Sequence, residues 1–254
     1  MRVRLFAMQR EIAGTREIEL DLPPEASIED AWTALVERFP RLAPGRAAVR
    51  FARNGTYTDA DTVLAAGDEV AMIPPVSGGS DAAEAGSGAA RVRVRILVIR
   101  PEPFAADILT ELSGRVATLD DGAVVGFLGV TRRSPGTPAP GQEAEAARHA
   151  GRSVEALTYE ALAPMALAVM AEIADEIEAR FGVARVAIVH REGDVPLGEP
   201  SVAIVTASPH RDAAFEAARY AIDETKARAP IWKAEQFSDG HVWIGDRARS
   251  GPEG

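Results

Sequence analysis

The chain of 254 residues contains no cysteine. This absence excludes disulfides, thiolate metal sites and cysteine nucleophiles. No segment approaches 18 consecutive apolar residues, so the sequence predicts no membrane-spanning helix. The N-terminal residues also lack the apolar core of a signal peptide, which makes a cytoplasmic location the default expectation. The four histidines show no HxxxH spacing, and a zinc site is therefore not expected.

Lysine is almost absent as well. Of the 28 basic residues, 26 are arginine, and both lysines, Lys226 and Lys233, lie in one short segment. The abundance of Ala, Arg and Gly suggests a GC-rich genome. In such a genome arginine codons are favoured over lysine codons at every position where either residue is suitable. An ammonium loses its proton far more readily than a guanidinium when it is buried or crowded by charge. We therefore interpret the two lysines as candidates for proton transfer, with chance clustering as the alternative.

The formal net charge of -10 is spread over the whole chain. Residues 1–79 hold 9 basic and 12 acidic side chains, and the remainder holds 19 and 26. Because both parts are acidic, general nucleic-acid binding is not expected. This balance is still compatible with a small basic pocket for an anion.

The first 75 residues predict a β-grasp, ubiquitin-like domain with the order ββαββ. A helix is expected over Ile28–Phe39, where apolar residues recur at helical spacing, Ser27 can cap the first turn and Pro40 ends the pattern. A turn is expected at Ala13-Gly14-Thr15, and Asn54-Gly55 favours a hairpin. The expected strands are Arg2–Phe6, Glu17–Leu22, Val49–Ala52 and a last segment that ends at Ile73.

The segment Ile73–Gly79 ends in a pair of glycines. Without Cβ atoms such a tail is slim enough to enter a narrow channel and present its last carbonyl to another active site. That use requires a free C-terminus, yet Ser80 follows. Residues 80–91 consist almost entirely of small residues and read as a flexible linker. The predicted domains are therefore 1–79 and 92–250, and Gly79 marks a possible processing site.

The second domain reads as an α+β fold with a largely antiparallel sheet. The expected strands are Val92–Ile99, Ala123–Thr131, Ser153–Glu160, Val186–His190, Val202–Ala207, Ile231–Phe237 and His241–Ile244. The expected helices are Phe104–Leu112, Ala161–Phe181 and Asp212–Arg228. Residues 132–152 are rich in Pro, Gly and Ala, and a loop of that length is usually functional or disordered.

Four segments of this domain could carry chemistry. Ser208–Asp212 precedes a helix, so free backbone amides together with His210 and Arg211 could bind an anion; helix capping is the alternative. Pro230 turns the chain between Lys226 and Lys233, and two close ammoniums lower each other's proton affinity. Other readings of these lysines are a surface position and a strand edge.

The third segment is Phe127–Arg133, which ends an apolar strand with cations where the long loop begins. Strand ends commonly carry ligand-binding groups, although a lone arginine there is often structural. The segment His190–Gly193 closes another strand, and it could either contact a ligand or form a turn.

Taken together, these motifs resemble the molybdopterin synthase family. Residues 1–79, through Leu64–Ala71 and Ile73–Gly79, resemble its small sulfur-carrier subunit, and residues 92–250 resemble its large catalytic subunit. The motifs of the large subunit are Phe127-x-Gly129-x-x-Arg132, Leu157-x-Tyr159-Glu160, His190-Arg191-x-Gly193, Ser208-Pro209-His210-Arg211 and Lys226-x-Arg228-Ala229-Pro230-Ile231-Trp232-Lys233. The resemblance implies an α/β-hammerhead-like fold for the second domain and a homodimer formed through it.

The resemblance also implies a reaction. An adenylating enzyme activates the carrier's terminal glycine, here Gly79, which then becomes a thiocarboxylate. Two sulfurs pass in turn to cyclic pyranopterin monophosphate and form the dithiolene of molybdopterin, without a cofactor or a metal. By position, Lys226 would be the principal acid/base and Lys233 would assist it.

The same resemblance assigns the substrate's phosphate to Arg132, His210 and Arg211, with Phe127 supporting the wall of the site. The fusion departs from the family, because Gly79 has no free carboxylate while Ser80 is attached. We therefore expect a protease to cut after Gly79. Two rival readings are a carrier for thiolation in another pathway, such as transfer-RNA or thiazole synthesis, and a scaffold whose tail is never freed.

Overall fold

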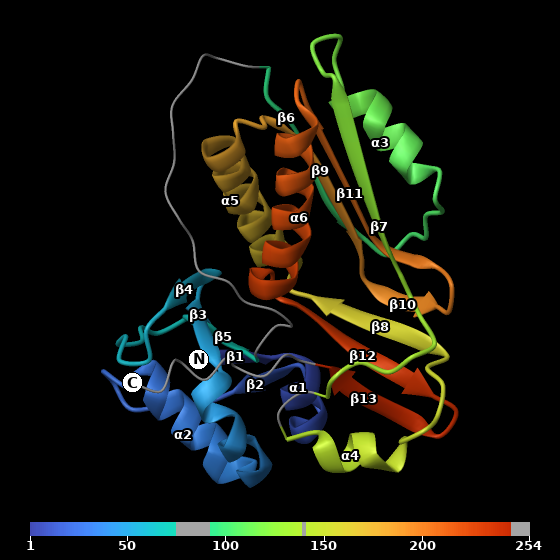
Figure 1. Cartoon of the computed structure of the whole chain (residues 1–254). Helices are drawn as coiled ribbons and strands as arrows, with labels where there is room; N and C mark the ends of the chain where they lie inside the picture. Colours follow the sequence, from blue (N-terminus) through green and yellow to red (C-terminus); the bar gives the residue numbers. More distant parts are fainter. Residues whose placement is uncertain (75–91, 139–140, 245–254) are drawn as a thin grey trace, which may run out of the picture. The chain divides into compact units, whose positions relative to one another are not determined.

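The computed structural model describes residues 1–74, 92–138 and 141–244 (Figure 1). The chain divides into two compact units, one of Met1–Pro75, Thr137–Ala150 and Val242–Gly254, the other of Val76–Gly136 and Gly151–His241. The expected boundaries at residues 79, 80, 91 and 92 fall on or beside undescribed residues, and that division into domains stays a prediction.

The first unit contains a five-stranded mixed sheet. Its strands lie in the order β2-β1-β5-β3-β4, with β1 and β5 parallel and the other neighbours antiparallel. One face of the sheet packs on helix α2, and the two share a core that includes Val3, Trp32 and Met72. The β-grasp expectation is confirmed. The elements within residues 1–74 are β1 (Arg2–Leu5), α1 (Ala7–Ala13), β2 (Glu17–Glu19), α2 (Ile28–Arg38), η1 (Pro40–Ala48), β3 (Arg50–Arg53), β4 (Thr56–Thr58) and β5 (Glu69–Ile73).

Two local signals in this unit are confirmed. Ser27 caps α2 through a capping box, in which the Asp30 amide donates to the Ser27 hydroxyl and the Ser27 amide donates to the Asp30 carboxylate. Asn54 and Gly55 join β3 to β4 with φ angles of 51° and 83°. Positive φ at both positions is the geometry that Asn-Gly favours in a two-residue hairpin.

The structure also corrects the expected order ββαββ. Where only a turn was expected between the first two strands, helix α1 intervenes and ends at Gly14 in the left-handed conformation. In α1 the buried residues are Ala7 and Gln9, so the helix has no apolar stripe that periodicity could reveal. The 3-10 helix η1 was likewise missed, since it contains two prolines and little apolar periodicity.

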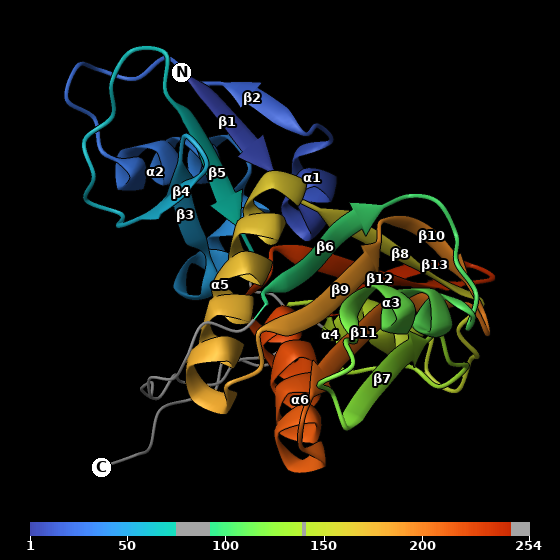
Figure 2. The same ribbon diagram turned by 90° about the horizontal axis from the view of Figure 1, so that it is seen from above.

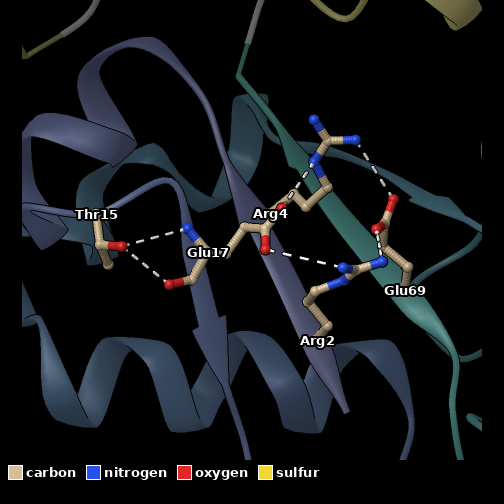
Figure 3. Close-up of polar contacts among 5 residues, drawn as sticks. All are labelled: Arg2, Arg4, Thr15, Glu17 and Glu69. Atoms are coloured by element: carbon tan, nitrogen blue, oxygen red, sulfur yellow. Dashed lines mark hydrogen bonds and ion pairs between the residues drawn. The ribbon is translucent and has the colours of Figure 1, made fainter.

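Strand β1 alternates between the core and a charged face. Figure 3 shows Arg2 and Arg4 beside Glu17 of β2 and Glu69 of β5. Arg2 lies 3.9 Å from Glu17 and 2.7 Å from Glu69, and Arg4 lies 3.9 Å and 3.5 Å from the same two carboxylates. Exposed ion pairs contribute only about 0–1 kcal/mol each. Their effect here is to favour the register that keeps both arginines off the core.

The second unit holds the sheet β6-β9-β11-β7, and the order of a further sheet is β10-β8-β12-β13. Strands β6 and β9 are parallel, whereas β9–β11, β11–β7, β10–β8 and β8–β12 are antiparallel. The strands are β6 (Val94–Arg100), β7 (Ala123–Val130), β8 (Ala156–Ala161), β9 (Arg185–Arg191), β10 (Gly193–Pro196), β11 (Pro200–Ser208), β12 (Ile231–Phe237) and β13 (Gly240–Ile244). The expected α+β class with mostly antiparallel pairing is confirmed, but the strands form two sheets rather than one.

Helices cover both faces of the sheet β6-β9-β11-β7, as the two views in Figures 1 and 2 agree. Helix α3 (Ile108–Val116) packs on one face, over Ala187 and Val189 of β9. Helices α5 (Ala163–Phe181) and α6 (Arg211–Arg228) lie on the other. Every residue of β9 and β11 is buried, as expected for central strands covered on both sides.

Three details of the sequence reading need correction. Helix α3 begins at Ile108 rather than at Phe104. The segment 132–152, expected as one long loop, contains α4 (Glu143–Arg148). Strand β10 was missed because its four residues, GDVP, carry Pro and Gly and have low strand propensity. The stripe of α5, by contrast, is buried as expected at Met165, Val169, Ile173 and Ile177.

Candidate active site

Helix α6 sets the geometry of the candidate site. It follows β11 and runs back along it, and the Thr206 hydroxyl of β11 donates to the Ala214 carbonyl of α6 at 2.8 Å (Figure 1). Eighteen helical residues span about 27 Å. The first turn of α6 therefore lies near the end of β11, and its last turn, with Lys226, lies over the beginning of that strand.

The predicted anion-binding pair lies at the first turn of α6. His210 is the N-cap residue, its amide donates to the Ser208 hydroxyl at 3.4 Å, and its side chain is exposed. The Arg211 guanidinium is largely exposed and lies 3.6 Å from the Asp212 carboxylate. Fifteen residues of helix separate Arg211 from Lys226, a rise of about 22 Å. A single copy of the chain thus does not bring this pair to Lys226.

The loop before β7 packs against the Ser208–Asp212 segment. Gly122 packs so closely on the chain that a Cβ there would lie 2.6 Å from the Pro209 carbonyl oxygen. Beside it, the buried Asp121 carboxylate forms an ion pair with Arg185 and accepts hydrogen bonds from the Thr118 amide and hydroxyl. The Asp121 pKa lies below its usual value, because these bonds outweigh the effect of burial.

The charges of Lys233 and Arg132 both act on one buried carboxylate, that of Glu235. Lys233 and Glu235 are two residues apart on β12, so they share one face of the strand. Glu235 is 4% exposed, and its Oε1 accepts a hydrogen bond from the Gly136 amide at 2.8 Å. Burial raises the Glu235 pKa, while the charges of Lys233 and Arg132 act in the opposite direction. The same carboxylate therefore experiences both predicted cations.

Lys226 acts on a second buried group, His190 of β9. His190 is 7% exposed, and its ring lies edge-on to Tyr159, with ring centroids 4.8 Å apart and an interplanar angle of 76°. Burial, with a further contribution from the Lys226 charge, lowers the His190 pKa to about 4. Tyr159 in turn pairs with Lys233 across the β8–β12 register. The two lysines consequently flank one pair of rings.

Burial raises the Tyr159 pKa, and its hydroxyl donates to the Ser201 hydroxyl at 3.1 Å. The structure thus places Lys226, Lys233 and Arg132 around the cluster Tyr159, His190 and Glu235, which we call the ring–carboxylate cluster. Glu235 was missed from the sequence, although its spacing from Lys233 predicts a shared strand face. The remaining predicted site residue, Gly79, lies outside the described residues.

The described residues contain no group of three His, Asp or Glu side chains placed to hold a metal ion. Among them, no helix is long and apolar enough to cross a membrane.

Glu235→Gln should change how stability depends on pH. Because burial raises the Glu235 pKa, its ionisation opposes folding, and wild-type stability is lost as the pH rises through that folded pKa. Glutamine keeps an acceptor for the Gly136 amide and cannot ionise. At pH 7 we therefore expect the unfolding temperature of the variant to lie a few °C above that of the wild type. A stabilisation of about 1 kcal/mol produces a shift of this size. At pH 4 the two proteins should unfold at similar temperatures.

Thermal unfolding followed by circular dichroism between pH 4 and pH 8 measures this difference. Glu155→Gln is the matched control, since it removes an exposed carboxylate near the same strands. If the unfolding temperatures of the wild type and Glu235→Gln depend on pH in the same way, ionisation of the buried Glu235 does not destabilise the fold.

The chain thus combines a β-grasp unit with an α+β unit, and the α+β unit carries the amines of Lys226 and Lys233. Residues 3–79 match the model of the ThiS family, and residues 99–228 match the model of the MoaE protein. The chain therefore belongs to the MoaE family.

Relatives named molybdopterin synthase catalytic subunit occur in Bacillus subtilis and Pyrococcus abyssi. The first is 47% identical over 97 residues, which cover 38% of this chain and 62% of the relative. The second is 36% identical over 152 residues, which cover 59% of this chain and 91% of the relative. The match thus spans less than two thirds of the Bacillus subtilis protein.

Among solved structures, molybdopterin synthase from Staphylococcus aureus is 34% identical to this chain, with a TM-score of 0.49. The superposition covers 58% of this chain and 96% of the other.

Proposed function

We propose that this chain is a molybdopterin synthase in which carrier and catalytic parts are fused. The observation that carries the proposal is the convergence of Lys226, Lys233 and Arg132 on the ring–carboxylate cluster. The match of residues 3–79 to the ThiS family supports a carrier whose tail ends at Gly79. The absence of cysteine is compatible with this role, because sulfur can be carried on a terminal acyl group instead of a thiol.

In the proposed reaction the Gly79 thiocarboxylate sulfur forms a C–S bond to a side-chain carbon of cyclic pyranopterin monophosphate, and a C–O bond at that carbon breaks, so that the displaced oxygen leaves with a proton. Water then cleaves the acyl–sulfur bond, so the sulfur stays on the pterin and Gly79 regains a carboxylate. Lys226 moves protons at the reacting centre, and Lys233 stabilises the negative charge that develops there. Two rounds give the dithiolene of molybdopterin.

Arg132 binds the substrate's phosphate in this proposal, together with His210 and Arg211 of a second copy. Strand β7 is an edge strand of its sheet and is apolar throughout, with Val124 and Val130 42% and 47% exposed. An uncovered apolar edge favours pairing with another chain. Ser208 pairs with Ala123 at one end of β7, and Arg132 follows the other end.

A two-fold axis at the β7 edge pairs β7 with its copy in antiparallel orientation. That pairing sets the Ser208–Arg211 segment of one copy beside Arg132 of the other. The separation of about 22 Å along α6 then presents no obstacle, since each site takes its phosphate ligands from both copies.

The proposal requires two further partners, an adenylating enzyme that loads the sulfur and a protease that cuts after Gly79. A cytoplasmic location also stays a prediction. Mass spectrometry of protein purified from its native host tests the whole scheme. We expect a fragment that ends at Gly79 with one oxygen replaced by sulfur. Uncut chains that still make molybdopterin would contradict cleavage, and a lack of thiocarboxylate in every preparation would favour the scaffold reading.

A further inference from the structure

His190 lies in the same layer as the end of α6 that carries Lys226. On β9 the residues Ala187 and Val189 face α3, so His190, of the opposite parity, faces the α6 side. Its partner on β11 is Val202, which shares a face with Thr206, the residue bonded to α6.

Distances along the two elements agree with this placement. Val202 precedes Ser208 by six residues of strand, about 20 Å. Lys226 follows Arg211 by fifteen residues of helix, about 22 Å. Since α6 runs back along β11, Lys226 and His190 lie at the same level of the layer. The effect of the Lys226 charge on the pKa of the imidazole, which is smaller than the effect of burial, is consistent with this placement.

The protonation state of the imidazole follows from its contacts. His190 Nδ1 lies 2.7 Å from the Arg191 carbonyl oxygen, which can only accept a hydrogen bond. Nδ1 must therefore carry the proton, and Nε2 of the neutral ring has a free lone pair. The edge-on contact with Tyr159 limits rotation of the ring. The imidazole is thus a fixed acceptor beside an amine.

We propose that His190 is a positioning residue for Lys226: its Nε2 accepts a hydrogen bond from the Lys226 amine and holds that amine toward the reacting centre. Within the described residues, the exposed Lys226 side chain makes no hydrogen bond and no ion pair, so it is free to adopt this arrangement. Tyr159 contacts His190 and pairs with Lys233, so the ring pair sets the spacing of the two amines. This inference rests on the proposed function of Lys226.

Two substitutions of His190 distinguish the roles of the two ring nitrogens, Nδ1 and Nε2. His190→Asn keeps an amide donor near the position of Nδ1 and deletes the acceptor, whereas His190→Gln places an amide oxygen near the position of Nε2. In steady-state kinetics we expect kcat to fall about 10-fold or more in the asparagine variant and less than about 3-fold in the glutamine variant. KM should change less than about 2-fold in both. Equal losses of kcat in the two variants would overturn the proposal.

A second readout does not depend on turnover. Because the chain contains two lysines, labelling with [13Cε]lysine gives two side-chain signals in an NMR spectrum. In His190→Asn the Lys226 signal should shift and sharpen, while the Lys233 signal stays in place. In His190→Gln both signals should remain near their wild-type positions. An unmoved Lys226 signal in the asparagine variant would overturn the proposal even if the proposed reaction is correct.

The reciprocal experiment avoids any change in the buried layer. Lys226→Ala replaces an exposed residue, and Arg219→Ala removes another exposed cation of α6 as the matched control. Long-range 15N–1H spectra should show His190 Nε2 shifted by Lys226→Ala and unaffected by Arg219→Ala. Identical Nε2 shifts in both variants would refute the contact. If the contact is seen but Lys226→Ala retains full activity, the fault lies in the proposed function instead.

Discussion

Lys226→Ala is expected to lower product formation by orders of magnitude while leaving the fold intact. Lys226 is exposed in the last turn of α6, and alanine is the best helix former. The lost interaction with the helix dipole costs about 0.3–1 kcal/mol, so the unfolding temperature should fall by a few °C at most. Loss of a positioned acid/base should instead lower turnover by about 10²–10⁴-fold. The measurement is single-turnover conversion of cyclic pyranopterin monophosphate by protein carrying the thiocarboxylate.

Two variants show whether the loss is specific to the amine. Arg219→Ala removes an exposed charge from the same helix and should keep wild-type activity. Lys226→Arg keeps the charge, but a guanidinium does not give up its proton, so turnover should remain low. Thiocarboxylate loading of Gly79 should be equal in all three. If Lys226→Ala turns over at the wild-type rate, Lys226 has no part in the chemistry.

Local signals in the sequence predicted several elements correctly. The capping residue Ser27, the Asn54-Gly55 turn and the stripe on α5 each act over a few residues, and each is found in the structure. Helix α1 has no such signal, since its burial follows from tertiary packing and leaves no period in the sequence. The scarcity of lysine singled out Lys226 and Lys233 in the sequence, and their role in proton transfer stays a prediction.

The ring–carboxylate cluster could not be predicted in the same way. Tyr159 lies opposite Lys233 only because β8 and β12 adopt one particular register, although the two residues are 74 positions apart. His190 reaches the cluster from a different sheet. Such convergence depends on long-range pairing, which strand propensity does not specify. The length of α6, by contrast, was readable, and it already separates Arg211 from Lys226.

That separation leads to the second large effect, which is complementation between two inactive variants. If each site uses Lys226 of one copy with His210 and Arg211 of the other, Lys226→Ala and His210→Ala/Arg211→Ala impair different halves of it. Each homodimer should have very low activity. A heterodimer purified through two different tags contains one intact site and one doubly defective site. Its activity should therefore be about half that of the wild type.

The reverse arrangement is the control. When all three substitutions are on one chain and the partner is wild type, both shared sites contain a defect, so activity should be lost. Sites confined to one chain predict the opposite pair of results, with no activity in the first heterodimer and about half in the second. The two preparations contain the same substitutions in the same number of copies, so a difference in folding or loading cannot imitate either pattern. Half activity in the second heterodimer would mean that His210 and Arg211 serve their own chain or none.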